Sequence, residues 1–164
     1  MRNVIAVYVE NKYGVLTRVS GLFMRKGFNI DSLTVGETDD PNYSRITVTL
    51  DGDENDRDQL INQLKKLFNV KQVKHLESGS SVERELMLIK VRNTPENRSE
   101  IIAASEIYRA KVVDYTTDAI CVEVTGESSK IKAFIEVMKP LGIVEMCRTG
   151  IVALERGGNI MEKQ

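Results

Sequence analysis

The segment that decides the fold is Val4-Ile5-Ala6-Val7-Tyr8-Val9-Glu10-Asn11-Lys12-Tyr13-Gly14-Val15-Leu16. Residues 3–9 are nearly all apolar and rich in β-branched side chains, which predicts a strand. The four residues from Asn11 to Gly14 predict a turn. From Val15 onward apolar residues recur at three- and four-residue spacing, which predicts an amphipathic helix that ends at Gly27. A strand is therefore expected to pass into a helix through one short turn.

The rest of the first half adds a strand pair, a helix and a final strand. The expected strands cover residues 30–35, 43–50 and 70–76, and the expected helix covers residues 60–68. Asn55 or Asp56 is the expected cap of that helix, because both side chains can accept a hydrogen bond from the first helical N–H groups. The predicted order of this half is βαββαβ.

The second half repeats this order after a small polar segment. The expected strands cover residues 86–91, 112–115 and 120–124, with a last strand within 143–154, and the helices follow Thr94-Pro95 and cover residues 131–138. Thr94 is the expected cap, with Pro95 in the first helical position. We therefore predict an α+β fold of two ferredoxin-like units, each a four-stranded antiparallel sheet with two helices on one face.

The face of the first sheet that carries no helices poses a problem of burial. The first strand is apolar at consecutive positions, so neither of its faces is expected to be fully solvated. We infer a dimer that either buries this open face or extends the sheet edge to edge.

Composition excludes several classes of function. The 164-residue chain has 41% hydrophobic residues, which is typical of a globular protein with a core. Its formal net charge is −1, so it has no overall positive field that would attract nucleic acid or acidic membranes. Aromatic residues make up only 5%, and the third strand has none of the stacking pairs of RNA-recognition modules. No apolar run reaches the roughly 18 residues that span a bilayer, and no signal-peptide pattern is present, which predicts a cytoplasmic protein.

Residues suited to catalysis or metal binding are few. His75 is the single histidine, and the serines at 78, 80 and 81 have no base at a recognisable spacing. Cys121 and Cys147 lie far apart in apolar stretches, which favours small buried side chains over a redox pair. The sequence therefore predicts no catalytic residues and no metal site.

The segment with the best binding chemistry is the first turn, from Glu10 to Leu16. Backbone N–H groups at the start of a helix can hold a carboxylate, and Gly14 lets a ligand approach the backbone closely. Asn11 can hydrogen-bond both an ammonium and a carboxylate, and Asn29-Ile30 can add polar and apolar contacts. These residues can bind an α-amino acid, or they can serve only as turn and capping residues; spacing alone leaves both interpretations open.

Three longer segments resemble one known family. They are Asn11-x-x-Gly14-Val15-Leu16, Gly27-Phe28-Asn29-Ile30-Asp31-Ser32-Leu33-Thr34-Val35 and Arg148-Thr149-Gly150-Ile151-Val152-Ala153-Leu154. They resemble the ACT-domain small regulatory subunits of acetolactate synthase, also called acetohydroxyacid synthase, and the likeness covers almost the whole chain. The resemblance implies an ACT domain at residues 1–77, a linker at 78–84, a ferredoxin-like domain at 85–157 and a tail at 158–164.

The same resemblance implies a function. Such subunits form homodimers through their ACT domains, and a branched-chain amino acid, with valine as the expected ligand, binds at that interface. The implied contacts are Asn11, Gly14, Val15 and Leu16 of one subunit with Asn29 and Ile30 of the other. Some relatives carry Ala where this chain has Val15, and the larger side chain could narrow the pocket.

The resemblance also implies a partner enzyme. The small subunit activates the catalytic subunit of acetolactate synthase and confers feedback inhibition in valine, leucine and isoleucine biosynthesis. Thiamine diphosphate, magnesium and FAD are expected on that catalytic partner and no cofactor on this chain. Two alternatives stay open: an ACT-type sensor that regulates another enzyme or transcription, and an enzyme of unfamiliar type that relies on His75 and scattered carboxylates.

Overall fold

The computed structural model describes residues 1–161 and divides into two compact units. The first unit contains residues 1–83 and, from the other end of the chain, the segment from residue 151 onward. The second unit, Arg84–Gly150, is thus inserted between two parts of the first. No helix within residues 1–161 is long and apolar enough to cross a membrane.

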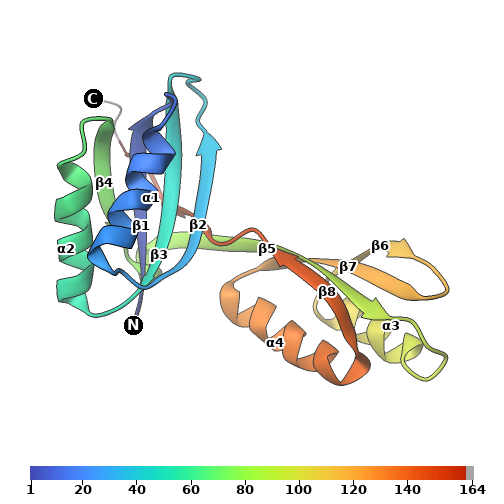
Figure 1. Ribbon diagram of the computed structural model, residues 1–164. Helices are drawn as coiled ribbons and strands as arrows, with labels where there is room; N and C mark the ends of the chain where they lie inside the picture. The colour runs from blue at the N-terminus through green and yellow to red at the C-terminus, as the bar shows by residue number, and fades with distance from the viewer. Residues whose placement is uncertain (162–164) are drawn as a thin grey trace. The chain divides into compact units, whose positions relative to one another are not determined.

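The first unit has the predicted βαββαβ order (Figure 1). Its elements are β1 (Arg2–Glu10), α1 (Val15–Lys26), β2 (Ile30–Glu37), β3 (Tyr43–Asp51), α2 (Glu54–Lys65) and β4 (Val70–Leu76). The strands form one sheet in the order β2-β3-β1-β4, and every neighbouring pair is antiparallel. Val7 on central β1 lies opposite Ile46 on one side and Val73 on the other. The α+β prediction is confirmed for this unit.

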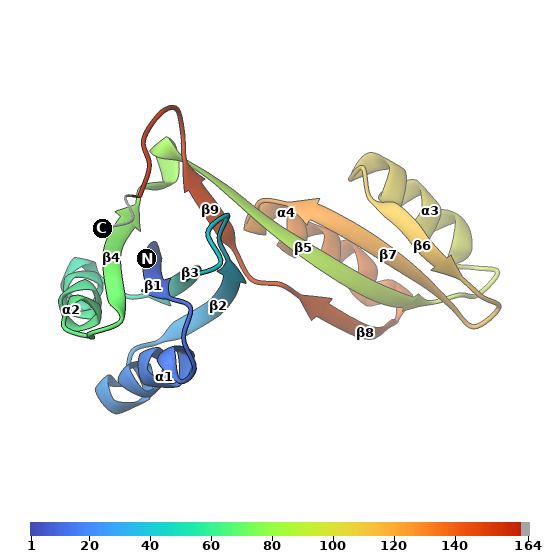
Figure 2. The ribbon, with the colours of Figure 1, turned by 90° about the horizontal axis from the view of Figure 1, so that it is seen from above.

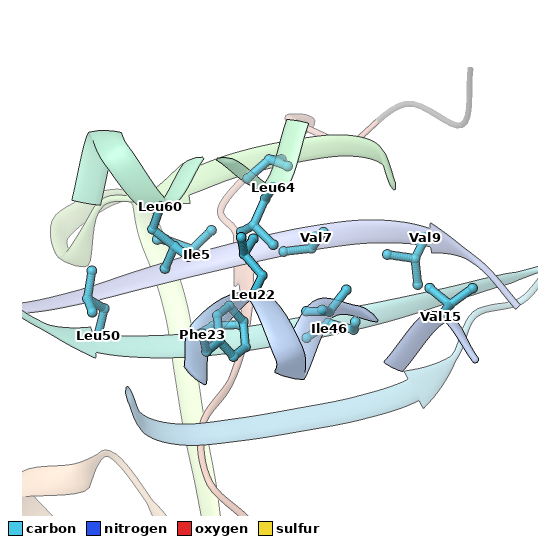
Figure 3. Close-up of a cluster of buried hydrophobic side chains, with 13 residues drawn as sticks. Ile5, Val7, Val9, Val15, Leu22, Phe23, Ile46, Leu50, Leu60 and Leu64 are labelled. Carbon is cyan, nitrogen blue, oxygen red and sulfur yellow. The ribbon is translucent and has the colours of Figure 1, made fainter. Parts of the chain in front are cut away.

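A continuous apolar core fills the space between this sheet and its two helices (Figure 3). Alternate residues of β1 and β3 point into it, because side chains of a strand alternate between faces. The helices contribute residues at three- and four-residue spacing. The core side chains are Ile5, Val7, Val9, Val15, Val19, Leu22, Phe23, Ile46, Val48, Leu50, Leu60, Leu64 and Val73.

Helix α1 begins and ends where the sequence predicts. Gly14 precedes it with φ of 83° and Gly27 follows it with φ of 68°, both in the left-handed region that glycine adopts without strain. Helix α2 differs from expectation at both ends. Its cap is Asp53, which forms a capping box with Asp56, and the helix stops at Lys65, so that Phe68 lies beyond it and is exposed.

The open face of the first sheet is covered by the chain's own C-terminal segment (Figure 2). The last predicted strand is in fact two, β8 (Ile143–Arg148) and β9 (Val152–Glu155), and β9 lies on the face turned away from α1 and α2. There Val4, Ala6 and Tyr8 pack with three side chains of the segment, Ile151, Ala153 and Met161. A dimer is therefore not needed to bury these positions. The predicted tail includes the buried Met161, and its residues 162–164 lie outside the described residues.

The second unit repeats the fold. Its elements are β5 (Ser81–Arg92), of which the first three residues group with the first unit, α3 (Arg98–Ile107), β6 (Lys111–Tyr115), β7 (Ala119–Gly126), α4 (Ser128–Met138) and β8. The strands follow the order β6-β7-β5-β8, and β9 also pairs with β5. Helix α3 starts later than predicted, because Thr94 caps a preceding turn by accepting the backbone N–H of Asn97 at 3.2 Å. Cys147 is exposed rather than buried, because it lies opposite Leu88 on the face of the second sheet that points away from the core.

The structure also differs from the expected domain boundaries. Ser78–Ser80 forms one 3-10 turn and Ser81 already begins β5, so most of the expected linker is regular structure. Residues 151–157, expected in the second domain, group with the first unit. Strand β9 still pairs with β5, as a strand of the second sheet, but its side chains pack on the first sheet. Apolar alternation gives no sign of what a strand's side chains will pack against, so the sequence could not assign this segment.

Candidate functional site

The turn between β1 and α1 leaves the start of the helix open. Gly14 precedes the helix and has no side chain with which to cap it, and the first helical turn contains no acidic residue. The N–H of Val15 donates to the carbonyl of Lys12 at 3.3 Å, and the N–H of Arg18 donates to Gly14 at 3.1 Å. The N–H groups of Leu16 and Thr17 precede the first intrahelical bond, so they are available to an anion.

The space in front of Gly14 is also open. A β-carbon built at this position would meet no atom within 4 Å of its own chain. A ligand carboxylate can therefore approach the backbone here without displacing a side chain.

Asn11 stands at the entrance of the same turn and is exposed. Its side-chain amide donates to the carbonyl of Pro41 at 2.9 Å, and its backbone N–H donates to Asn42 at 2.8 Å. These bonds tie the turn to the loop between β2 and β3. The side-chain carbonyl of Asn11 is the group that can accept a hydrogen bond from an ammonium.

A charged network that the sequence did not indicate supports this turn. The carboxylate of Glu10 lies 2.8 Å from Lys12 and 2.8 Å from Lys71, and it accepts a hydrogen bond from Asn69 at 3.1 Å. Lys12 first, and then Lys71 and Asn69, lower the pKa of Glu10 to about 2. Asn69 in turn accepts from the Arg18 guanidinium at 2.6 Å, so the network joins the end of β1 to the first turn of α1. No local pattern marks Asn69, because it reaches Glu10 only through the fold.

The two apolar residues predicted at the site point in different directions. Val15 is 5% exposed and lies in the core between α1 and the sheet (Figure 3), so its side chain is turned toward the protein interior. Leu16 is 44% exposed on the outer side of the helix and offers an apolar surface beside the open N–H groups. Within one chain, Leu16 rather than Val15 has a side chain accessible to a ligand.

Asn29 and Ile30 lie at the opposite end of α1. The helix spans twelve residues, which corresponds to about 17 Å. Asn29 accepts the backbone N–H of Asp51 at 3.0 Å, and Ile30 is half-buried against the core. One amino acid cannot touch Asn11 and Asn29 of the same chain.

The candidates for catalysis do not assemble into a site. His75 lies on β4 opposite Ile5, and burial together with the nearby Arg57 lowers its pKa. The hydroxyls of Ser80 and Ser81 both donate to the carbonyl of Glu77. Among residues 1–161, no three histidine, cysteine or acidic side chains are grouped as a metal site would require.

Two family models match the chain. The model for the AHAS small subunit-like ACT domain matches residues 5–72, and that for the small subunit of acetolactate synthase matches residues 84–157. The probable acetolactate synthase small subunit of Archaeoglobus fulgidus is 50% identical over 96% of this chain and 98% of that protein. This chain belongs to the acetolactate synthase small subunit family.

Further relatives agree with this assignment. The acetolactate synthase small subunit of Bacillus subtilis is 48% identical over 96% of this chain and 92% of that protein. The crystal structure of the acetolactate synthase small subunit from Thermotoga maritima superposes with a TM-score of 0.89 and 38% identity, over 97% of this chain and 99% of that one. The small-subunit resemblance and the two-unit α+β fold predicted from the sequence are both confirmed.

Proposed function

We propose that this chain is the regulatory subunit of an acetolactate synthase. It activates the catalytic subunit and confers feedback inhibition by a branched-chain amino acid, with valine as the expected ligand. The observation that carries the proposal is the open helix start at Gly14 beside Asn11, in a chain of the small-subunit family. Thiamine diphosphate, magnesium and FAD belong in this proposal to the catalytic partner.

The turn matches the head group of an α-amino acid. The N–H groups that follow Gly14 receive the carboxylate, and the helix dipole adds a favourable interaction with its charge. The side-chain carbonyl of Asn11 accepts from the ammonium. Leu16 offers an apolar surface for the ligand's branched side chain.

The complete site needs a second copy of the chain. Asn29 and Ile30 lie about 17 Å from the open turn of their own chain, at the far end of α1. Two copies related by a two-fold axis, with their α1 helices antiparallel, bring Asn29 and Ile30 of the second copy next to Asn11 and Gly14 of the first. Strand β2 is an edge of the first sheet, so its outer side is available for such pairing.

Inhibition follows if the ligand and the catalytic subunit prefer different arrangements of this dimer. A ligand that touches both copies favours one arrangement, and the catalytic subunit binds the other more tightly. Coupling of this kind usually amounts to about 1–3 kcal/mol, or roughly a 5- to 150-fold change in affinity.

Calorimetric titration with L-valine tests the ligand directly, with D-valine as the control. We expect saturable heat from the L form only, with one or two sites per dimer. Absence of binding by L-valine, L-leucine and L-isoleucine, both alone and with the catalytic subunit present, would contradict the proposed ligand.

A substitution at Gly14 tests the location of the site. Gly14→Asp places a negative charge where the ligand carboxylate binds, and no atom within 4 Å blocks a β-carbon there, although the left-handed backbone strains any side chain. Gly14→Asn is the matched control, because it has nearly the same shape and, like Asp, is among the few side chains that adopt the left-handed conformation. We expect Gly14→Asp to weaken valine binding at least tenfold more than Gly14→Asn, with similar melting temperatures. Equal valine affinities in the two variants would place the carboxylate elsewhere.

A further inference from the structure

The segment from residue 151 to residue 161 is held on the first sheet by polar contacts at several points. The Arg45 guanidinium donates to the backbone carbonyl of Ala153 at 2.8 Å, and Lys74 lies 2.7 Å from the carboxylate of Glu155. The segment is also held outside this sheet, because β9 pairs with β5 and the N–H of Arg156 donates to the carbonyl of Ser80, just before β5, at 2.8 Å. We call residues 151–161 the C-terminal segment and the sheet surface beneath it the outer face.

The apolar contacts of the C-terminal segment alternate along the chain. Ile151 and Ala153 are each 4% exposed, whereas Val152 and Leu154 between them are 49% and 62% exposed. This period of two is that of an extended strand with one side docked. On the outer face, the residues that the segment covers are Val4, Ala6, Tyr8 and Leu76, none more than 7% exposed.

We propose that the outer face is a docking site for an extended segment, and that the first unit is complete only when its own C-terminal segment fills that site. The first unit ends at Glu83 and resumes at Ile151, so the whole second unit is synthesised between the sheet and the segment that covers it. A chain that stops at residue 83 or 150 has the sheet but leaves four apolar side chains of the outer face bare.

The contacts define the sequence that the site accepts. Ile151, Ala153 and Glu155 occupy positions i, i+2 and i+4 on the docked side. Ala153 is buried in the same cluster as Ala6, so a small side chain fills this position. Lys74 selects an acidic residue at the third position, and Arg45 recognises the backbone itself. The site therefore takes an apolar, small, acidic pattern at alternate residues.

Supplying the segment as a separate peptide tests the docking site. A chain truncated after Gly150 is compared with a control truncated after Met161, and a labelled peptide of residues 151–161 is added to each. We expect the shorter chain to melt about 5–10 °C lower, to bind an apolar dye and to bind the peptide saturably. The control is expected to bind neither. Equal melting temperatures and no peptide binding would overturn the proposal.

A charge exchange tests the specific contact. A peptide with Glu155→Lys is expected to bind the shorter chain at least fivefold more weakly, and Lys74→Glu in that chain is expected to restore its binding. If the exchanged pair binds no better than the single mismatch, Lys74 does not select the segment.

A test in the full chain covers the case in which the shorter chain does not fold. Ala153→Glu places a charge on the docked side, and Val152→Glu places the same charge on the exposed side one residue away. We expect Ala153→Glu to lower the melting temperature and to make the C-terminal segment at least tenfold more sensitive to proteolysis than Val152→Glu. Equal sensitivity in the two variants would show that the segment is not held as proposed.

Discussion

At the residue scale, Glu10 links the candidate ligand turn to the rest of the first unit. Its carboxylate contacts Lys12, Lys71 and Asn69, and these partners lower its pKa to about 2 from 4.5. The unfolded chain therefore binds a proton at higher pH than the folded chain does. The stability that Glu10 contributes is fully present above about pH 5.5 and is lost as the pH falls through 4.5 toward 2.

Glu10→Gln is therefore expected to destabilise the protein above pH 5.5 and to have a smaller effect as the pH falls toward 2. Melting temperatures of the variant and the original chain between pH 2.5 and 7 check this. Glu106→Gln, at an exposed position on α3, serves as the control. If the difference in melting temperature between Glu10→Gln and the original chain stayed constant across this range, the charged partners of Glu10 would not contribute to stability.

A second residue-scale prediction concerns the buried Glu85 of the second unit. Its carboxylate is paired with Arg148 and accepts the hydroxyl of Ser128 at 3.0 Å, at the start of α4. Arg148→Met removes the guanidinium that pairs with this buried carboxylate, so we expect a loss of about 3 kcal/mol in unfolding free energy. Combining it with Glu85→Leu is expected to recover part of that loss. Denaturant titration measures both, and a double variant less stable than Arg148→Met alone would contradict the account.

At the scale of single elements, the N-terminus of α2 tests whether the observed cap, Asp53, stabilises the helix more than the predicted cap Asn55 does. Asp53 accepts the N–H of Asp56 at 2.9 Å, and Asp56 accepts the N–H of Asp53 at 3.1 Å. We expect Asp53→Ala to lower the free energy of unfolding by about 1 kcal/mol. Asn55→Ala is expected to lower it by less than about 0.5 kcal/mol, because Asn55 lies within the helix rather than at its cap. Equal losses in chemical denaturation would mean that the capping box contributes nothing.

Elements with a strong local signal could be predicted from the sequence, and those set by distant contacts could not. Helix α1 was predicted to the residue, because Gly14 and Gly27 each supply a left-handed backbone at its ends. The start of α3 was not, because Thr94 and Asn97 are both plausible caps and only the fold selects between them. The division of residues 143–154 into β8 and β9 was missed because both strands pair with β5, and only the side-chain contacts of β9 with the first sheet distinguish them.

The candidate site was predictable to a similar degree. The turn at Asn11 and Gly14 has a local sequence signal, and the structure places Gly14 before an uncapped helix and the Asn11 amide against the carbonyl of Pro41. The binding role of both residues stays a prediction. The side-chain direction of Val15 follows from the helix register against the sheet, which residue type does not reveal. Glu10, Asn69 and Arg18 meet only after β4 has paired with β1, so their network has no sequence signal.

At the scale of the whole molecule, the account predicts a dimer that forms through β2. Val35 is 43% exposed on this edge strand, so Val35→Asp places a charge in the expected interface. We expect it to weaken dimerisation at least tenfold, and to weaken valine binding with it, because the site needs both copies. Val113→Asp is the matched control, since Val113 is 52% exposed on β6, an edge strand of the second sheet. Sedimentation over a range of concentrations measures the dimer affinity of the Val35→Asp and Val113→Asp chains. Equal dimer affinities in these two variants would exclude the β2 interface.

The most direct test of the central claim is reconstitution with the catalytic subunit of acetolactate synthase from the same source. The rate of acetolactate formation is measured with the catalytic subunit alone, after addition of this chain, and after further addition of L-valine or D-valine. The account predicts that this chain raises the rate, that L-valine lowers it again and that D-valine does not, while the Gly14→Asp chain activates but resists L-valine. A rate that does not change when this chain is added would contradict the claim that it regulates that enzyme.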